Sequence, residues 1–146
     1  MKLLLVTLCS VLLFSTIKWE TDFEKARQLA VSEKKLILLN FSGSDWCGPC
    51  IRLHREIFES QVFENFANNQ LVLLNADFPR LKKNRLSKEQ QSKNDLLAEK
   101  YNIEGAFPLT LLLDANGKVL YKWDGLPSGS PEDFTNQVKS IVLGNK

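Results

Sequence analysis

Runs of apolar residues separated by polar turns divide this chain into alternating helices and strands. Residues 36–41 and 71–76 are almost continuously apolar, which is typical of strands covered on both faces of a sheet. Apolar residues in 23–31 instead recur at helical spacing, which predicts an amphipathic helix. We expect this helix to begin at Thr21, which has capping-box spacing to Glu24.

Three further helices are predicted from the same kind of pattern. One continues through residues 51–58, and because it has no proline we expect it to be straighter than usual. Another covers residues 61–68. The third covers about 88–100, with Leu96, Leu97 and Tyr101 in its apolar stripe.

An Asn-Gly pair near the C-terminus predicts a β-hairpin. Asn116 and Gly117 lie between the apolar segments 109–113 and 119–123, which is a strong local hairpin signal. A last helix begins after Ser130, which is followed by a first-turn proline and two acids. This order of helices and strands predicts an α/β protein with a mixed central sheet.

The first residues differ from the rest of the chain. Lys2 and the apolar run 3–14 have the pattern of a secretory signal, and the run is shorter than the roughly 20 apolar residues that cross a bilayer. No clean small-residue cleavage pair follows, so an uncleaved membrane anchor remains an alternative. We expect residues 1–18 to be a secretory segment and residues 19–146 to form one domain, which is exported to the periplasm or secreted.

The charge of the chain is nearly balanced. It has 19 basic and 17 acidic side chains, a formal net charge of +2, and therefore no overall attraction to nucleic acid or membranes. Basic residues gather in 80–93, but no aromatic residue lies among them, which argues against nucleic-acid binding. We expect a solvated loop leading into a helix; the alternative is a basic surface that selects an acidic partner.

Two of the three cysteines form a C-x-x-C motif. Cys47 and Cys50 open a helix-compatible segment, and a helix N-terminus favours the thiolate of Cys47, which we expect to be the nucleophile. Cys50 would be more shielded and would resolve a mixed disulfide. Zinc sites share this spacing but normally take four ligands, and the chain adds only Cys9 and His54, so no metal site is expected. His54 is expected to be an exposed helix residue rather than a proton carrier.

Two motifs carry a family resemblance. Residues 46–50 read Trp-Cys-Gly-Pro-Cys after a hydrophobic strand, and Phe107-Pro108 precedes the apolar run 109–113. From about Asp22 onward the chain resembles the thioredoxin superfamily, and its exported bacterial members in particular. The resemblance implies a thioredoxin-like fold, in which a mixed sheet is flanked by helices in a three-layer sandwich.

The resemblance also assigns roles to residues around the cysteines. It implies that Pro108 is a cis-proline facing the cysteine pair, and that Trp46, Phe107 and Pro108 form an apolar rim that binds the substrate peptide. Thioredoxins commonly place a buried acid beneath the cysteines to assist proton transfer from the second one. Here Asn40 takes that position, and an amide cannot carry the proton.

The implied activity is reduction of protein disulfides outside the cytoplasm, because Gly48-Pro49 between the cysteines resembles the reducing members. We expect a monomer without organic cofactor or metal, which acts in cell redox homeostasis. Its partners would be protein disulfide substrates and a thiol or membrane electron donor. Two alternatives remain: a thioredoxin-like binding or chaperone module without turnover, and a disulfide oxidase or electron relay.

Overall fold

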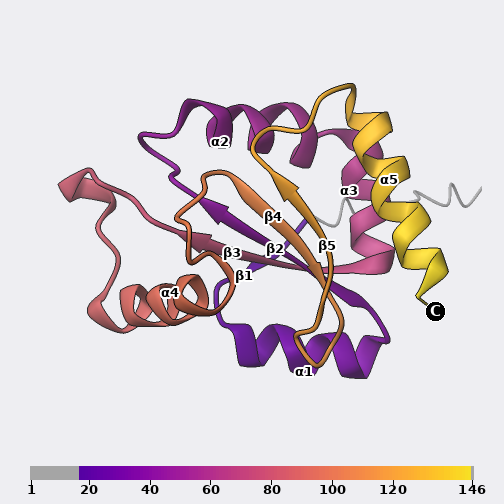
Figure 1. Ribbon diagram of the computed structural model, residues 1–146, viewed down its shortest axis with the longest axis horizontal. Coiled ribbons are helices and arrows are strands. Elements are labelled where there is room, and N and C mark those ends of the chain that lie inside the picture. Colours follow the sequence, from indigo (N-terminus) through magenta and orange to yellow (C-terminus); the bar gives the residue numbers. More distant parts are fainter. Residues whose placement is uncertain (1–16, 146) are drawn as a thin grey trace, which may run out of the picture.

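The computed structural model describes residues 17–145, which form a five-stranded mixed sheet between two layers of helices (Figure 1). The strand order is β1-β3-β2-β4-β5, with β1, β3 and β2 parallel and β4 and β5 antiparallel to their neighbours. The strands are β1 (Trp19–Glu20), β2 (Leu36–Ser42), β3 (Leu71–Asp77), β4 (Leu109–Leu113) and β5 (Val119–Asp124). The helices are α1 (Phe23–Glu33), α2 (Gly48–Arg52), η1 (Leu53–Phe58), α3 (Gln61–Gln70), η2 (Lys82–Asn84), α4 (Lys88–Tyr101) and α5 (Pro131–Gly144).

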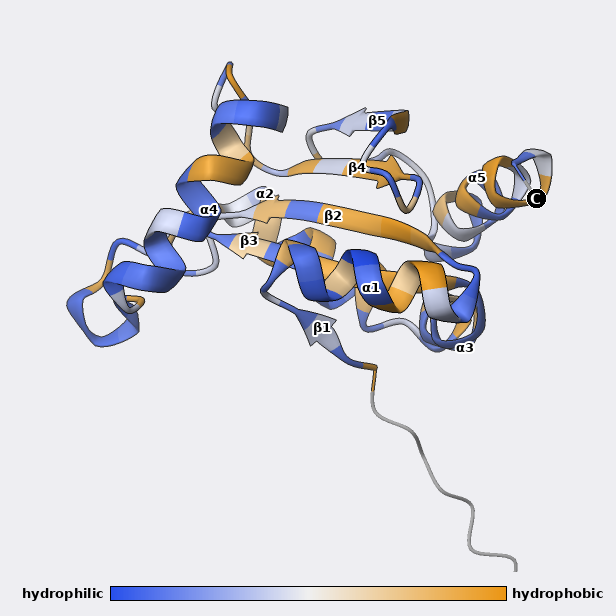
Figure 2. Cartoon of the chain, turned by 90° about the horizontal axis from the view of Figure 1, so that it is seen from below, coloured by the Kyte–Doolittle hydropathy of each residue, from blue (hydrophilic) through white to orange (hydrophobic). Residues whose placement is uncertain are grey.

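Side chains that alternate along the strands supply two separate cores, which confirms the predicted three-layer sandwich. Leu38 faces a core shared with η1, α3 and α5, whereas its neighbours Ile37 and Leu39 face a core beneath α1 and α4. Figure 1 shows the sheet between α1 and α2, and the colours of Figure 2 show that β2 and β4 are mainly apolar. The continuous apolar run that predicted β2 thus reflects burial on both faces.

The central strand β2 delivers the chain to one end of the sheet. It pairs in parallel with β3 up to the pair Ser42 and Asp77, and antiparallel with β4 from the pair Phe41 and Leu109. The end of β2, the end of β3 and the start of β4 therefore meet at one edge. Residues that follow β2 and residues that precede β4 are brought together there.

The hairpin β4–β5 forms as predicted. The Asp114 carboxylate accepts hydrogen bonds from the backbone N–H groups of Asn116 (2.8 Å) and Lys118 (2.9 Å). Gly117 has a φ of 85°, a conformation that favours glycine. The turn residues thus supply the backbone geometry and the hydrogen bonds that the Asn-Gly signal indicates.

Polar caps start the helices, one of them a residue later than predicted. Ser60 caps α3, and Ser130 caps α5 in a capping box with Asp133. For α1, however, the cap is Asp22 and not Thr21: the Asp22 side chain accepts a backbone N–H bond of 2.9 Å. A carboxylate satisfies the free N–H groups and the positive end of the helix better than a hydroxyl does.

The helix after the cysteines continues without a break but changes from α-helical to π-helical turns, which the sequence did not predict. α2 ends at Arg52, and η1 continues with the wider turns of a π-helix, in which the Glu59 N–H donates to the His54 carbonyl at 2.9 Å. The wider turns let Leu53, Ile57 and Phe58 all point into the core, with exposed fractions of 0%, 3% and 1%. Core packing therefore decides the helix geometry here.

Helix α4 has the predicted extent, but one of the three residues predicted for its apolar stripe faces solvent. Leu96, predicted to be buried, is 63% exposed, whereas Leu97 is buried. Tyr101 lies on the inner face as predicted, and so does Asn94, whose amide donates to the Asp77 carbonyl at 2.8 Å. The buried face thus includes the polar Asn94 and leaves out the apolar Leu96, and a pattern of apolar residues cannot predict this.

Strand β1 was not predicted, because two residues carry no periodicity. Trp19 pairs in parallel with Leu73, and its ring packs at 5.1 Å from that of Phe58. Most of the predicted secretory segment 1–18, including Cys9, lies outside the described residues. Between residues 17 and 145, no helix has the length and apolar content needed to cross a membrane.

Candidate active site

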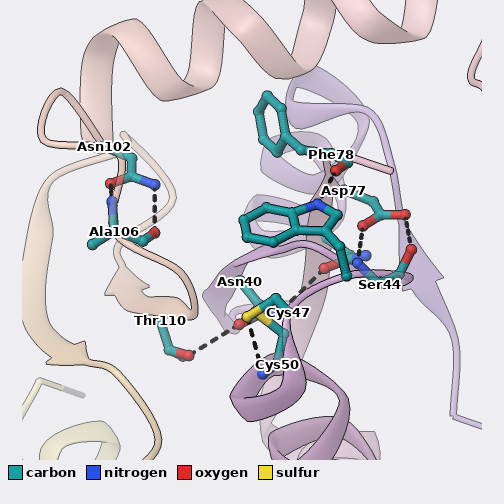
Figure 3. Close-up of a disulfide and its surroundings, with 11 residues drawn as sticks. Asn40, Ser44, Cys47, Cys50, Asp77, Phe78, Asn102, Ala106 and Thr110 are labelled. Atoms are coloured by element: carbon teal, nitrogen blue, oxygen red, sulfur yellow. Dashed lines mark hydrogen bonds between the residues drawn. A yellow bond between two sulfur atoms is a disulfide. The ribbon is translucent and has the colours of Figure 1, made fainter. Parts of the chain in front are cut away.

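The two cysteines of the C-x-x-C motif lie directly beyond the end of β2. Cys47 is the N-terminal cap of α2 and Cys50 lies in its first turn, with their Cα atoms 5.2 Å apart. Their sulfur atoms form a disulfide (Figure 3). The loop is closed by the Cys47 N–H, which donates to the Gly43 carbonyl at 2.9 Å.

The surroundings of the sulfurs favour negative charge on Cys47. The backbone N–H of Cys50 donates to the Cys47 sulfur at 3.3 Å, and this sulfur occupies the cap position at the start of α2. Cys47 and Cys50 are 5% and 3% exposed, so burial hardly distinguishes them. What distinguishes Cys47 is its cap position and the hydrogen bond it accepts.

An aromatic cluster borders the disulfide. The Trp46 ring meets that of Phe107 edge to face at 5.4 Å, and Phe107 meets Phe78 in the same way at 5.5 Å. The Trp46 indole N–H also donates to the Phe78 carbonyl at 2.7 Å. Phe78 was not among the expected site residues, because its contribution depends on the meeting of β3 with the loop after β2.

The turn before β4 supplies the predicted cis-proline. The bond between Phe107 and Pro108 is cis, and the Pro108 carbonyl accepts the Gly125 N–H at 2.9 Å. Pro108 is buried and Phe107 half-buried. Because Leu109 pairs with Phe41 at the end of β2, this turn lies at the same edge of the sheet as the cysteine loop.

A side chain not foreseen from the sequence holds the turn before Phe107. The Asn102 amide donates to the Ala106 carbonyl and accepts from the Ala106 N–H, both at 2.8 Å (Figure 3). Asn102 is only 5% exposed. The side chain of Asn102 thus satisfies both backbone groups of Ala106, as another backbone segment would do in a sheet. An asparagine directly after a helix was the only available signal, and it is not specific.

Two acids anchor the loop between β2 and the cysteines. The Ser44 N–H and hydroxyl both donate to the Asp77 carboxylate, at the end of β3. Asp45 accepts the backbone N–H groups of Arg80 at 2.9 Å and Leu81 at 3.0 Å, and the Asn84 amide at 2.9 Å. These bonds, that to Arg80 first, lower the pKa of Asp45 from its ordinary value.

Beneath the disulfide the buried polar group is neutral. Asn40 is 4% exposed, accepts the Thr110 hydroxyl at 3.1 Å and donates to the side-chain amide oxygen of Asn75 at 3.1 Å. Its hydrogen-bond partners are thus an amide and a hydroxyl. His54, in η1, has a half-exposed side chain whose ring packs beside Trp19, as expected for an exposed helix residue.

No group of three or more His, Cys, Asp or Glu side chains within residues 17–145 is arranged to hold a metal ion. The cysteine pair supplies a chemistry of its own. A dithiol and a disulfide interconvert by exchange with a second disulfide, without any further group.

Comparison with known proteins agrees with this geometry. Residues 18–115 match the thioredoxin-like family. The disulfide bond reductase DsbH of Chlamydia pneumoniae is 35% identical over 128 residues, which cover 88% of this chain and 74% of that protein. The thioredoxin-related protein DsbJ of the same organism is 28% identical over 107 residues, which cover 73% of this chain but 30% of DsbJ.

Solved structures show the same thioredoxin-like fold. The structure of a DsbH oxidoreductase superposes with a TM-score of 0.78 at 35% identity, covering 87% of this chain and 85% of that one. A thioredoxin from Thermus thermophilus, at 14% identity, superposes with a TM-score of 0.62 over 86% of each chain and shows the fold alone. The chain therefore belongs to the thioredoxin-like family, as a thiol–disulfide oxidoreductase.

Proposed function

We propose that this protein reduces disulfide bonds of other proteins outside the cytoplasm. The observation that carries the proposal is the Cys47–Cys50 disulfide at the start of α2, at the same sheet edge as the cis-proline turn and bordered by aromatic rings. The similarity to a disulfide bond reductase supports the direction. Gly48 and Pro49 between the cysteines, which resemble the reducing members, support it as well.

The proposed cycle starts from the reduced pair. The Cys47 thiolate attacks one sulfur of the client disulfide, so a Cys47–client bond forms, the client bond breaks, and the released client thiolate takes up a proton. Cys50 then loses its proton and attacks the Cys47 sulfur, which frees the second client thiolate. The client has gained two electrons and two protons, and the protein is left with the Cys47–Cys50 disulfide seen in the structure.

The proton of Cys50 needs an acceptor in the second step. Asn40 and its partners Asn75 and Thr110 are neutral and cannot accept it. We infer that water or the departing client thiolate takes this proton. With an amide in place of an acid at position 40, resolution by Cys50 becomes the step most sensitive to how well the client excludes or admits water.

The client is proposed to bind beside the cis-proline. The residue before a cis-proline offers its backbone to an extended peptide, which adds to the edge as a short strand does. Trp46 and Phe107, both half-buried and in contact at 5.4 Å, would form the apolar rim, with Pro108 behind them. Cys47 and Cys50 are the proposed catalytic residues.

Renewal of the dithiol requires an outside donor. We propose that a small thiol or a membrane-bound thiol protein reduces the Cys47–Cys50 disulfide after each turnover. The secretory pattern of residues 1–18 supports action in the periplasm or beyond the cell surface. Mass spectrometry of the protein isolated from an exporting bacterial host would test whether this segment is removed.

The decisive experiment is the reduction potential of the purified protein, measured by equilibration with glutathione or dithiothreitol buffers. A value near or below about −250 mV supports a reductase, whereas a value near about −120 mV would make the protein an oxidant. Insulin reduction by Cys47→Ser and Cys50→Ser variants completes the test. We expect both to lose turnover and only Cys50→Ser to accumulate mixed disulfides; undiminished turnover would refute the assignment.

A further inference from the structure

The segment after β3 forms a strongly basic projection. Residues 80–88, which we call the basic loop, carry five cationic side chains and no acidic one. The loop leaves the body of the protein between β3 and α4 (Figure 1), and it is polar over most of its length (Figure 2). The cationic residues are Arg80, Lys82, Lys83, Arg85 and Lys88, all of them exposed.

The charges of the basic loop are not neutralised by neighbouring acids. Within residues 17–145, none of the five cations lies within 4.0 Å of a carboxylate oxygen. Lys93, which follows on α4, is different, because it pairs with Asp22 at 2.9 Å and Glu89 at 3.1 Å. The basic loop thus presents a concentrated positive charge on a protein whose net charge is only +2.

The basic loop is fastened to the redox site. Asp45, two residues before Cys47, accepts three hydrogen bonds from the loop, and their donors are Arg80, Leu81 and Asn84. The Arg80 guanidinium also lies over the Trp46 ring, 3.6 Å from its centroid. The positive charge is therefore held beside the peptide-binding rim instead of moving freely in solvent.

This placement determines what the charge can recognise. Charges act over about 10 Å at moderate ionic strength, and an extended peptide advances roughly 3.3 Å per residue. A client whose disulfide reaches Cys47 therefore brings the residues flanking its cysteine within range of the basic loop. The loop has no aromatic residue for stacking on bases, and Leu81, 48% exposed, is its one strongly exposed apolar side chain.

We propose that the basic loop is a specificity subsite that binds an acidic polypeptide segment beside the client disulfide. The inference rests on the proposed reductase function and adds a client class to it. Acidic flanks gain attraction to Lys82, Lys83 and Arg85 during encounter and binding, whereas neutral flanks gain none. The alternative partner, an anionic membrane surface, is an outcome of the test below.

The test compares two disulfide peptides with the same cystine core, one flanked by Asp and Glu and the other by Asn and Gln. The readout is the ratio of kcat/KM for the acidic peptide to kcat/KM for the neutral one, so each variant carries its own reference. We expect a ratio of about 10 at low ionic strength, which falls toward one when salt is raised.

Two triple variants with the same loss of charge separate the loop from the net charge. K82Q/K83Q/R85Q removes cations of the basic loop, and we expect the ratio to fall to about one or two. K34Q/K118Q/K139Q removes three exposed cations at the C-terminal cap of α1, on the hairpin turn and on α5, away from the disulfide, and should keep the wild-type ratio. A ratio near one in the wild-type protein, or equal loss in both variants, would overturn the proposal.

The remaining outcomes distinguish the two proposals. If reduced protein reduces neither peptide, the reductase function fails. If both peptides are reduced equally, the function stands and the subsite fails. Co-sedimentation with phosphatidylglycerol vesicles that is lost only in K82Q/K83Q/R85Q, together with a peptide ratio of one, would assign the loop to a membrane surface and overturn the acidic-polypeptide assignment.

Discussion

Gly43 leaves the space in which the side chain of Trp46 lies. A Cβ atom at this buried position would come within 2.6 Å of Cζ2 and 2.7 Å of Nε1 of the Trp46 indole. The indole ring thus occupies the space that any other residue at position 43 would need. The position of Trp46 over the disulfide loop depends on this glycine.

We therefore expect Gly43→Ala to displace Trp46 and slow disulfide reduction by about tenfold or more, since small displacements of positioned groups cost rate. The Trp46 indole N–H resonance should move as its 2.7 Å bond to the Phe78 carbonyl is lost. Gly144→Ala is the control, because a Cβ there meets nothing within 4 Å. An unchanged indole resonance in Gly43→Ala would contradict the argument.

At Asn40 the structure predicts the cost of restoring an acid. Asn40 is 4% exposed, and its hydrogen-bond partners among residues 17–145 are Asn75 and Thr110, neither of them a cation. In Asn40→Asp, burial would raise the pKa of the new carboxyl above its unfolded value. The free energy of unfolding of this variant is then intact at a pH below the pKa that the carboxyl has in the unfolded chain. It decreases by about 1–3 kcal/mol as the pH rises through the higher pKa that the carboxyl has in the folded protein.

Urea unfolding of the oxidised protein between acidic and neutral pH measures this loss. Asn75→Asp is the matched control, because Asn75 is less buried and should show a smaller dependence on pH. If Asn40→Asp matched the wild-type protein at every pH, the site would have to be more hydrated than its burial indicates.

At the scale of elements, the contact between the cysteine loop and the basic loop should depend on pH. Hydrogen bonds, that from the Arg80 N–H first, hold the pKa of Asp45 below its ordinary value. The stabilisation of this contact by Asp45 is therefore complete at a pH above the pKa of an aspartate in the unfolded chain. It is lost as the pH falls through the lower pKa of Asp45 in the folded protein.

The backbone amide shifts of Arg80 and Leu81, followed by NMR, should titrate together at a pH below the usual aspartate value of about 3.9. Asp45→Asn should abolish this titration, since the neutral amide has no charge to lose. Asp114→Asn removes a carboxylate on the distant hairpin turn and should leave it in place. Titration of both amides at the ordinary aspartate value would show that the contact is weak.

How far the sequence predicts this structure depends on how local the cause is. The strands β2 and β3, the hairpin and the caps of α3 and α5 follow from patterns within a few residues. The C-x-x-C motif and Pro108 are local too. In contrast, β1, the π-helical turns of η1 and the clamp of Asn102 on Ala106 arise from tertiary contacts. So does Asp45, whose partners lie more than thirty residues away along the chain.

For the molecule as a whole, Phe58 connects several helices and a strand within one core. It is 1% exposed, and its ring lies 5.1 Å from Trp19, 5.1 Å from Phe63 and 6.0 Å from Phe134. It thus joins β1, α3 and α5 to the helix that follows the cysteines. The helix carrying the disulfide is held by the same packing that stabilises one of the two cores.

Phe58→Ala should therefore lower the free energy of unfolding by about 3–5 kcal/mol, as expected for a large buried ring. Leu96→Ala, at a position 63% exposed, should change it by less than about 0.5 kcal/mol. Urea unfolding of both variants measures the difference. Equal effects would mean that β1, α3 and α5 are not coupled through Phe58.

The direction in which the chain enters the sheet also governs how the protein can be attached to something else. Trp19 pairs with Leu73, and Ile17 lies near Leu71 at the start of β3, whereas the disulfide lies beyond the opposite ends of β2 and β3. A bead, a chip or a lipid joined ahead of Ile17 would thus hold the protein on the side opposite the disulfide. The disulfide would face away from the support, so we expect the tethered protein to reduce a client as fast as the free protein does.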